Sequence, residues 1–202
     1  MKRLVGVIFP DFELLDLAGP LEMFGNLGEQ FEVVLAAEQA GPVASTQKVS
    51  LIAQESFATC PPADFLLLPG GTGTFPQGRN EAMLDFLRRM SAGAEQVMTV
   101  CSGSALLART GALDGCRATT NKAYFEMCAA EGPGVHWVKE ARWVEDGTFA
   151  TSSGVSAGID MALAIIARHV GAETADRLAL LTEYEWHRDA SWDPFAKAHG
   201  LA

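Results

Sequence analysis

The sequence lacks any apolar run long enough to span a bilayer. The apolar run from Leu4 to Phe9, which follows Met1-Lys2-Arg3, is too short for the core of a signal peptide and lacks a small-residue cleavage site. It is typical of the first strand of a fold. With no export signal and no membrane segment, the sequence predicts a cytoplasmic protein with no membrane partner.

Cysteine is scarce, and its spacing does not suit a metal ion. The four cysteines, Cys60, Cys101, Cys116 and Cys128, contain no Cys-x-x-Cys pair, and no pair of histidines lies near them. A structural zinc site is therefore not expected. The predicted cytoplasmic location also argues against disulfides.

Positive charge is scarce as well. Only 15 lysines and arginines stand against 25 aspartates and glutamates, which gives a net charge of −10. Such a surface repels phosphate backbones, so we expect no nucleic-acid partner. The glycines of Pro69-Gly70-Gly71-Thr72-Gly73 fit neither a Walker loop nor a dinucleotide fingerprint, so nucleotide binding has little support.

What the sequence does contain is a repeated alternation of strand and helix patterns. No linker, internal repeat or low-complexity segment interrupts the 202 residues, and a chain of this length can bury about 70% of its unfolded surface in one core. We therefore expect one domain over residues 1–202. Strands are predicted at 4–9, 31–37, 63–68, 97–100, 118–120, 135–138 and 142–150 (with a turn at 145–147). A β-hairpin or short edge strands are expected at 42–52, and helices from 19–20 and at 80–90, 122–130, 156–170 and 174–184.

The strands are short and continuously apolar, which is typical of parallel sheets buried on both faces. This pattern predicts an α/β domain with helices on both sides of the sheet. Within it, the stripe Tyr124, Phe125, Met127 and Cys128 is expected in the core. Ser156 is expected to cap the helix that follows it, with Asp160 as an acid in its first turn.

The most informative stretch is the run from Val97 to Leu107. A β-branched strand ends at Cys101, small residues follow at once, and an Ala/Leu helical pattern begins. This pattern predicts a sharp strand-to-helix turn with a reactive side chain at the corner. A thiol beside a helix N-terminus is favoured as thiolate, so we predict that Cys101 is an ionised nucleophile. The alternative is a buried structural cysteine.

A carboxyl group accompanies this cysteine in the predicted fold. Asp16 is flanked by leucines just before or within the start of a helix, so it is either an exposed charge near the helix dipole or a buried, protonated acid. Ligands of parallel α/β sheets bind at the carboxyl ends of the strands. Asp16, Gly70-Gly71, Cys101-Ser102 and the loop around Val155 all follow predicted strands, so we expect them to converge.

Together these motifs resemble the DJ-1/PfpI superfamily, and within it the isocyanide hydratases. The resemblance rests on Phe9-Pro10, Leu15–Pro20, Leu68–Gly71, Val100–Ser104, Ala118–Thr120 and Ser156–Asp160, and it runs from about residue 3 to about residue 184. It implies a flavodoxin-like three-layer sandwich, as in class I glutamine amidotransferases, and a homodimer. It also implies a small-molecule substrate and no metal, nucleotide or redox cofactor.

The resemblance further implies roles for individual residues. A cysteine at the position of Cys101 attacks the terminal carbon of R–N≡C, an acid at the position of Asp16 handles protons, and the Ser102 hydroxyl contacts substrate or water. Backbone N–H groups of Gly71 and Ser102 would form an anion pocket, with Gly70 and Val155 as further substrate-binding positions. A soft thiolate suits the isocyanide carbon, and a neutral acid suits the proton that must be delivered.

Two departures keep other functions open. Ser102 replaces the histidine that follows the cysteine in PfpI-type proteases, which argues against peptidase activity. Asn121 stands where many relatives have a histidine, and the four histidines of this chain match no catalytic position, so a Cys-His dyad is not supported. The alternatives are action on 2-oxoaldehydes, and a non-catalytic protein whose reactive thiol responds to oxidants.

Overall fold

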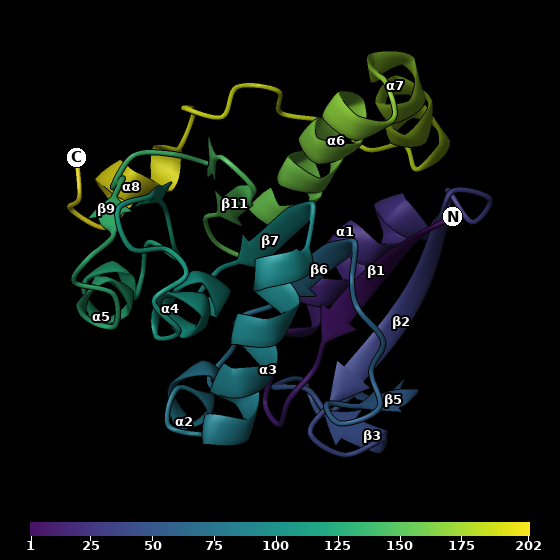
Figure 1. Cartoon of the computed structure of the whole chain (residues 1–202). Coiled ribbons are helices and arrows are strands. Elements are labelled where there is room, and N and C mark those ends of the chain that lie inside the picture. The colour runs from purple at the N-terminus through teal and green to yellow at the C-terminus, as the bar shows by residue number, and fades with distance from the viewer.

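The computed structural model describes residues 1–202, and its centre is a seven-stranded sheet (Figure 1). The strand order is β10-β11-β7-β6-β1-β2-β5. All neighbours pair in parallel except β10 and β11, which are antiparallel. The strands are β1 (Lys2–Val7), β2 (Phe31–Ala37), β5 (Glu55–Ser56), β6 (Phe65–Leu68), β7 (Gln96–Val100), β10 (Trp143–Asp146) and β11 (Phe149–Ser152).

Apolar content explains which strands lie in the middle. Every residue of β6 and β7 is buried, as expected for strands covered on both faces. Two small sheets lie outside the main one: β3 (Gly41–Ala44) pairs antiparallel with β4 (Ser50–Ala53), and β8 (Arg117–Ala118) pairs parallel with β9 (His136–Trp137). The hairpin expected at 42–52 is thus confirmed.

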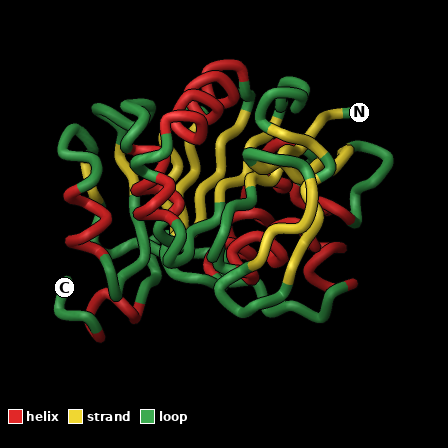
Figure 2. The backbone as a smooth tube through the Cα atoms, turned by 90° about the horizontal axis from the view of Figure 1, so that it is seen from below, coloured by secondary structure: helices red, strands yellow, loops and turns green.

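Helices cover both faces of the sheet, so that the strands form the middle of three layers (Figure 2). Helix α1 packs against α6, and α6 packs against α7, while α4 contacts α2, α3 and α5. The helices are α1 (Leu14–Gly25), α2 (Thr74–Gln77), α3 (Glu81–Gly93), α4 (Gly103–Ala108), α5 (Phe125–Ala130), α6 (Ala157–His169), α7 (Ala172–Leu181) and α8 (Pro194–Ala198). The predicted α/β fold with a mostly parallel sheet is therefore confirmed.

The first helix begins earlier than predicted. It starts at Leu14, so Pro20 lies inside it rather than at its first position. The reason is helix packing: a Cβ on Gly19 would lie 2.6 Å from the Ile159 side chain, and a Cβ on Gly158 would lie 3.3 Å from the Pro20 ring. Gly19 and Pro20 therefore allow α1 and α6 to approach closely, and they do not mark a helix start.

Several local predictions were also wrong. Tyr124 and Met127 are exposed, because α5 is only six residues long and turns only Phe125 and Cys128 inward. Ser156 is at the N-cap position of α6, as predicted, but its side chain makes no capping hydrogen bond. The turn expected within 142–150 is by contrast confirmed: β10 and β11 are antiparallel strands joined at Gly147, whose φ of +58° suits a tight turn. The last helix of the chain is α8, not the helix at 172–181.

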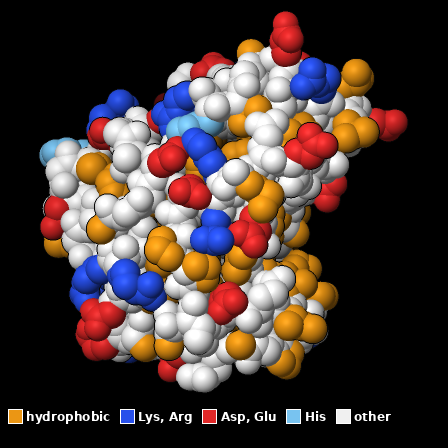
Figure 3. Space-filling view, turned by 45° about the vertical axis from the view of Figure 1, so that its right-hand side comes forward, with side chains coloured by type: hydrophobic (Ala, Val, Ile, Leu, Met, Phe, Trp, Pro, Cys, Tyr) orange, Lys and Arg blue, Asp and Glu red, His pale blue; other side chains and the backbone are white.

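Most of the buried apolar residues, 46 in all, form one connected cluster around the sheet. None of the helices combines the length and the apolar composition that crossing a membrane would require. On the face drawn in Figure 3, acidic and basic side chains are interspersed, so the excess of negative charge does not form one continuous patch there.

Candidate active site

Cys101 lies on a strained turn directly after β7. Its φ is +57°, a left-handed conformation that costs energy in a residue with a side chain. The helix α4 begins two residues later at Gly103, where an added Cβ would lie 2.4 Å from the carbonyl oxygen of Leu68. Only glycine therefore lets the helix start so close to the end of β6. The sharp strand-to-helix turn predicted at this position is confirmed.

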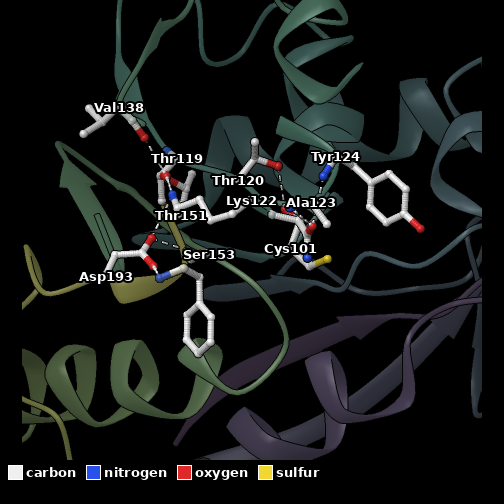
Figure 4. A network of polar contacts seen from close by, with 12 residues as sticks. Cys101, Thr119, Thr120, Lys122, Ala123, Tyr124, Val138, Thr151, Ser153 and Asp193 are labelled. Carbon is white, nitrogen blue, oxygen red and sulfur yellow. Dashed lines mark hydrogen bonds and ion pairs between the residues drawn. The ribbon is translucent and has the colours of Figure 1, made fainter. Parts of the chain in front are cut away.

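Hydrogen bonds on both sides hold this strained residue in place. The Cys101 N–H donates to the carbonyl oxygen of Ser153 at 2.9 Å. The Cys101 carbonyl oxygen accepts from the hydroxyls of Thr120 (3.0 Å) and Ser104 (3.1 Å). Figure 4 shows Thr120 above Cys101, with the sulfur pointing toward the side on which Tyr124 lies. The surrounding loops thus fix the direction of the thiol.

Asp16 is a fully buried acid in the first turn of α1. Its Oδ2 accepts a hydrogen bond from the Gly70 N–H at 2.9 Å, and its buried Oδ1 has no hydrogen-bond partner. Burial raises the pKa of Asp16 from 3.8 to about 8, against the opposing effect of the Gly70 N–H. The carboxyl group therefore keeps its proton at neutral pH, as the second of the two interpretations predicted.

The thiol of Cys101 is 7% exposed and interacts with the Asp16 carboxyl. Burial raises the pKa of Cys101 well above its usual value, and the nearby Asp16 raises it further. The Ser102 N–H and the Asn121 side chain oppose this shift, but they do not outweigh it. The prediction of an ionised thiol at neutral pH is therefore wrong. Helix α4 has only six residues, so its dipole is a weak source of stabilisation compared with the loss of solvation.

Ser102 and Gly71 are engaged with each other rather than facing solvent. The Ser102 hydroxyl is buried, accepts from the Gly71 N–H at 3.1 Å and lies 3.0 Å from the Thr74 hydroxyl. Gly71 has a φ of +120°, and an added Cβ would lie 2.5 Å from backbone atoms of the loop before α1. Contrary to the expected arrangement, the Ser102 hydroxyl is thus fully occupied within the protein, and the Gly71 N–H is already paired.

Gly70 and Val155 both lie close to the turn that carries Cys101. An added Cβ on Gly70 would lie 2.6 Å from the Ser102 nitrogen and 3.1 Å from Asp16 Oδ2, so the absence of a side chain lets the carboxyl and the turn approach. Val155 lines a cavity of about 240 Å³ next to the turn. Asn121 also lines this cavity, and its side chain acts to lower the pKa of Cys101, whereas Cys101 itself does not line the cavity.

Sequence reasoning missed the contribution of Asn121 and of the C-terminal segment. In the sequence, Asn121 stands out only as the replacement of a histidine, although its position after two threonines places it at the end of a predicted strand. Asp193 and Lys122 form a buried ion pair with Nζ and Oδ2 3.2 Å apart, which holds α8 beside the site. No local pattern connects these two residues, so their pairing carries no signal in the sequence.

The chemistry available here is that of a neutral thiol beside a neutral carboxylic acid, shielded from water. Such a pair can add a sulfur atom and deliver a proton to the same small substrate. No group of three or more His, Cys, Asp or Glu side chains is arranged to hold a metal ion. The fold and the site thus define a class of α/β proteins that carry a cysteine on a strained turn after a central parallel strand, next to a buried acid.

Comparison with known proteins gives this class a family. The model of the DJ-1/PfpI family matches residues 2–168, and the chain belongs to this family. It is 38% identical over 178 residues to the isonitrile hydratase of Pseudomonas putida, a match that covers 88% of this chain and 76% of that protein. It is 26% identical over 180 residues to the Parkinson disease protein 7 homolog of Danio rerio, covering 86% and 93% of the two chains.

Solved structures agree with this assignment. A ThiJ/PfpI family protein from Pseudomonas syringae superposes with a TM-score of 0.86 at 30% identity, covering 99% of this chain and 83% of that chain. The DJ-1beta of Drosophila melanogaster superposes with a TM-score of 0.81 at 21% identity, over 92% and 99% of the chains. The latter likeness concerns the fold alone.

Proposed function

We propose that this protein is a hydratase that converts isocyanides into N-substituted formamides at Cys101. The observation that carries the proposal is the pairing of the Cys101 thiol with Asp16, a buried acid that keeps its proton at neutral pH. The identity of 38% to an isonitrile hydratase supports the same substrate class. Neither of the two steps of this reaction requires a redox change.

In the first step, the thiol adds across the terminal carbon of R–N≡C. The sulfur of Cys101 bonds to that carbon, and the carbon receives a proton, so the product is the thioimidate Cys–S–CH=N–R. Asp16 is the group that donates this proton, and the S–H proton of Cys101 then restores the acid. Because both groups begin neutral, no charge has to be created in the buried site before the substrate arrives.

In the second step, water adds to the thioimidate carbon. One water proton goes to the nitrogen, and the tetrahedral adduct Cys–S–CH(OH)–NH–R collapses to the formamide HC(=O)–NH–R with return of the proton to sulfur. Asp16 accepts and returns protons in this step as well. The Ser102 N–H, which faces the sulfur, stabilises the negative charge that develops there when the C–S bond breaks.

In this proposal Ser102 and Gly71 act by holding the turn. The hydrogen bond between the Gly71 N–H and the Ser102 hydroxyl joins the end of β6 to the end of β7, and so fixes Gly70 and its bond to Asp16. Ser102→Ala would leave the Gly71 N–H without its partner. We therefore place Cys101 and Asp16 as catalytic residues and Gly70, Gly71 and the Ser102 hydroxyl as positioning groups.

The test is an assay of the purified protein with alkyl isocyanides, with formamide detected by mass spectrometry. The parent protein should form the formamide, Cys101→Ala should form none, and Asp16→Asn should be slowed by a factor of roughly 10²–10⁴, the usual contribution of a positioned acid. Cys128→Ala is the matched control, because Cys128 is also a buried free thiol. Full activity in Cys101→Ala would refute the mechanism, and lactate formation from methylglyoxal without isocyanide turnover would favour the 2-oxoaldehyde alternative.

A further inference from the structure

A cavity of about 240 Å³ lies next to the turn that carries Cys101. Three separate segments line it: the turn after β8, the loop between β11 and α6, and the C-terminal helix α8. Its lining residues include Asn121, Lys122, Ser153, Val155, Phe195 and His199. None of the lining residues is acidic. The two proposed chemical steps use none of these side chains.

Two of the lining residues connect the cavity to the reactive cysteine. The Ser153 carbonyl oxygen accepts the Cys101 N–H, and the Asn121 side chain interacts with the Cys101 sulfur. The Asn121 Oδ1 accepts the backbone N–H groups of Ala123 (2.9 Å) and Tyr124 (3.2 Å), so its amide NH₂ is the group left to face the sulfur. Asn121 therefore lies beside both the thiol and the cavity.

The C-terminal wall of the cavity is anchored by a buried ion pair. The side chains of Lys122 and Asp193 are only 2% and 1% exposed, and Lys122 Nζ also donates to the Thr119 hydroxyl at 2.6 Å. Asp193 Oδ1 accepts the Phe195 N–H at 3.0 Å and so caps α8. Figure 4 shows Asp193 and Lys122 joined in the network that reaches Cys101 through Thr119 and its neighbours. Because Asp193 neutralises Lys122, the cavity presents no unpaired lysine charge.

A second buried ion pair fixes the segment that leads to α8. Asp160 Oδ2 accepts from the Arg142 guanidinium, with Nη2 at 2.5 Å. The other oxygen of Asp160 accepts from the Tyr184 hydroxyl (3.1 Å) and from the His187 N–H (2.9 Å). The stretch from Tyr184 to Asp193, which leads to Phe195, is thus held at both ends by buried polar contacts.

We propose that this cavity receives the N-substituent of the isocyanide, and that Phe195 determines which substituents fit. The inference rests on the proposed function and specifies its substrates: compact, uncharged substituents, held between Val155 and Phe195. A charged substituent finds no free counter-ion in the cavity. A substituent larger than the cavity meets the Phe195 ring, which α8 and the ion pair hold in place.

The test compares kcat/KM for benzyl isocyanide with kcat/KM for ethyl isocyanide in two variants. Phe195→Ala should raise the benzyl-to-ethyl ratio roughly tenfold, and Phe195→Trp should lower it, because a change of a few carbon atoms in a substrate pocket alters discrimination by about that factor. Trp192→Ala is the matched control. Trp192 belongs to the same segment and is 44% exposed against 52% for Phe195, but it packs on His187 and Arg142 rather than on the cavity.

A second measurement does not depend on isocyanide turnover. Cys101 is alkylated with iodoacetamide and with N-benzyl iodoacetamide, and the two rate constants are compared by mass spectrometry. The same variants should shift this ratio in the same directions if the cavity faces the thiol. An unchanged ratio in both Phe195 variants, or an equal shift in Trp192→Ala, would overturn the assignment of the cavity. A shifted alkylation ratio in a protein that hydrates no isocyanide would instead support the cavity and refute the hydratase proposal.

Discussion

The Cys101 sulfur is subject to two opposing effects. The first turn of α4 and the Ser102 N–H favour a thiolate, whereas burial and the Asp16 carboxyl favour a thiol. Helix dipoles at exposed sites contribute about 0.3–1 kcal/mol, while burial can shift the pKa of a group by several units at about 1.36 kcal/mol each. Burial therefore decides the protonation state. Sequence patterns reveal the helix N-terminus but not the depth of burial, which is why the turn could be predicted and the charge could not.

Asp16 makes the free energy of unfolding depend on pH. Its pKa is about 8 in the folded protein, against 3.8 for an unperturbed aspartate side chain, so between these values the folded state holds a proton that the unfolded state has lost. Stability therefore falls as pH rises from about 4 to about 8. Relative to Asp16→Asn, the parent protein should lose roughly 3–4 kcal/mol between pH 5 and pH 8, measured by urea unfolding. Equal pH dependence of the two proteins would show that the carboxyl is ionised when folded.

The neutral thiol also predicts slow oxidation of Cys101. Peroxide attacks thiolates in exposed positions, whereas Cys101 is buried and its raised pKa disfavours the thiolate. Cys116 is the only one of the four thiols that is not buried. After mild peroxide treatment at pH 7, mass spectrometry should find added oxygen on Cys116 before Cys101. The reverse order would favour a protein that responds to oxidants.

At the scale of elements, patterns of apolar residues predicted the strands well, because β6 and β7 are buried on both faces and therefore mainly apolar, with Gln96 and Thr99 of β7 as the exceptions. Glycine and proline were less informative. Gly19-Pro20 is typical of a helix start, but its function is close packing between α1 and α6, which depends on a partner far away in the sequence. By contrast, Asp193-Pro194 is a typical helix start at which a helix, α8, does begin.

The start of α4 gives a test at this scale. Gly103→Ala would place a Cβ 2.4 Å from the Leu68 carbonyl oxygen, so the turn would have to open. We expect a loss of about 1–3 kcal/mol in the free energy of unfolding, the usual cost of overpacking, together with loss of activity. Gly93→Ala in α3 is the control, because nothing lies within 4 Å of the added Cβ, and it should not destabilise. A Gly103→Ala variant as stable as this control would contradict the geometry of the turn.

At the scale of the whole molecule, the two buried ion pairs tie the C-terminal segment to the sheet. Neither pair follows from the sequence: its pattern predicts Asp160 as a first-turn acid of α6, and the structure shows it also as the buried partner of Arg142. Lys122 and Asp193 lie far apart in the sequence, and only the three-dimensional structure brings them together. Long-range pairs of this kind cannot be read from local patterns.

The Lys122–Asp193 pair can be tested with a double-mutant cycle. Lys122→Met alone leaves a buried carboxylate unpaired, and Asp193→Asn alone leaves a buried ammonium unpaired, so each should cost about 3–5 kcal/mol in the free energy of unfolding. The double variant should be clearly less destabilised than the sum of the two. Asparagine can still cap α8, which keeps the helix intact. Strict additivity in urea unfolding would mean that the two charges do not interact.

The two edge strands of the central sheet are short, so they present few free backbone groups with which a neighbouring molecule could pair. One edge is β5, which has only two residues, and the other is β10, which runs antiparallel to the rest and is four residues long. Fibrous growth needs a long open strand on which the next chain can form backbone hydrogen bonds. The central sheets of two copies of this protein are therefore poorly suited to join edge to edge into a continuous sheet.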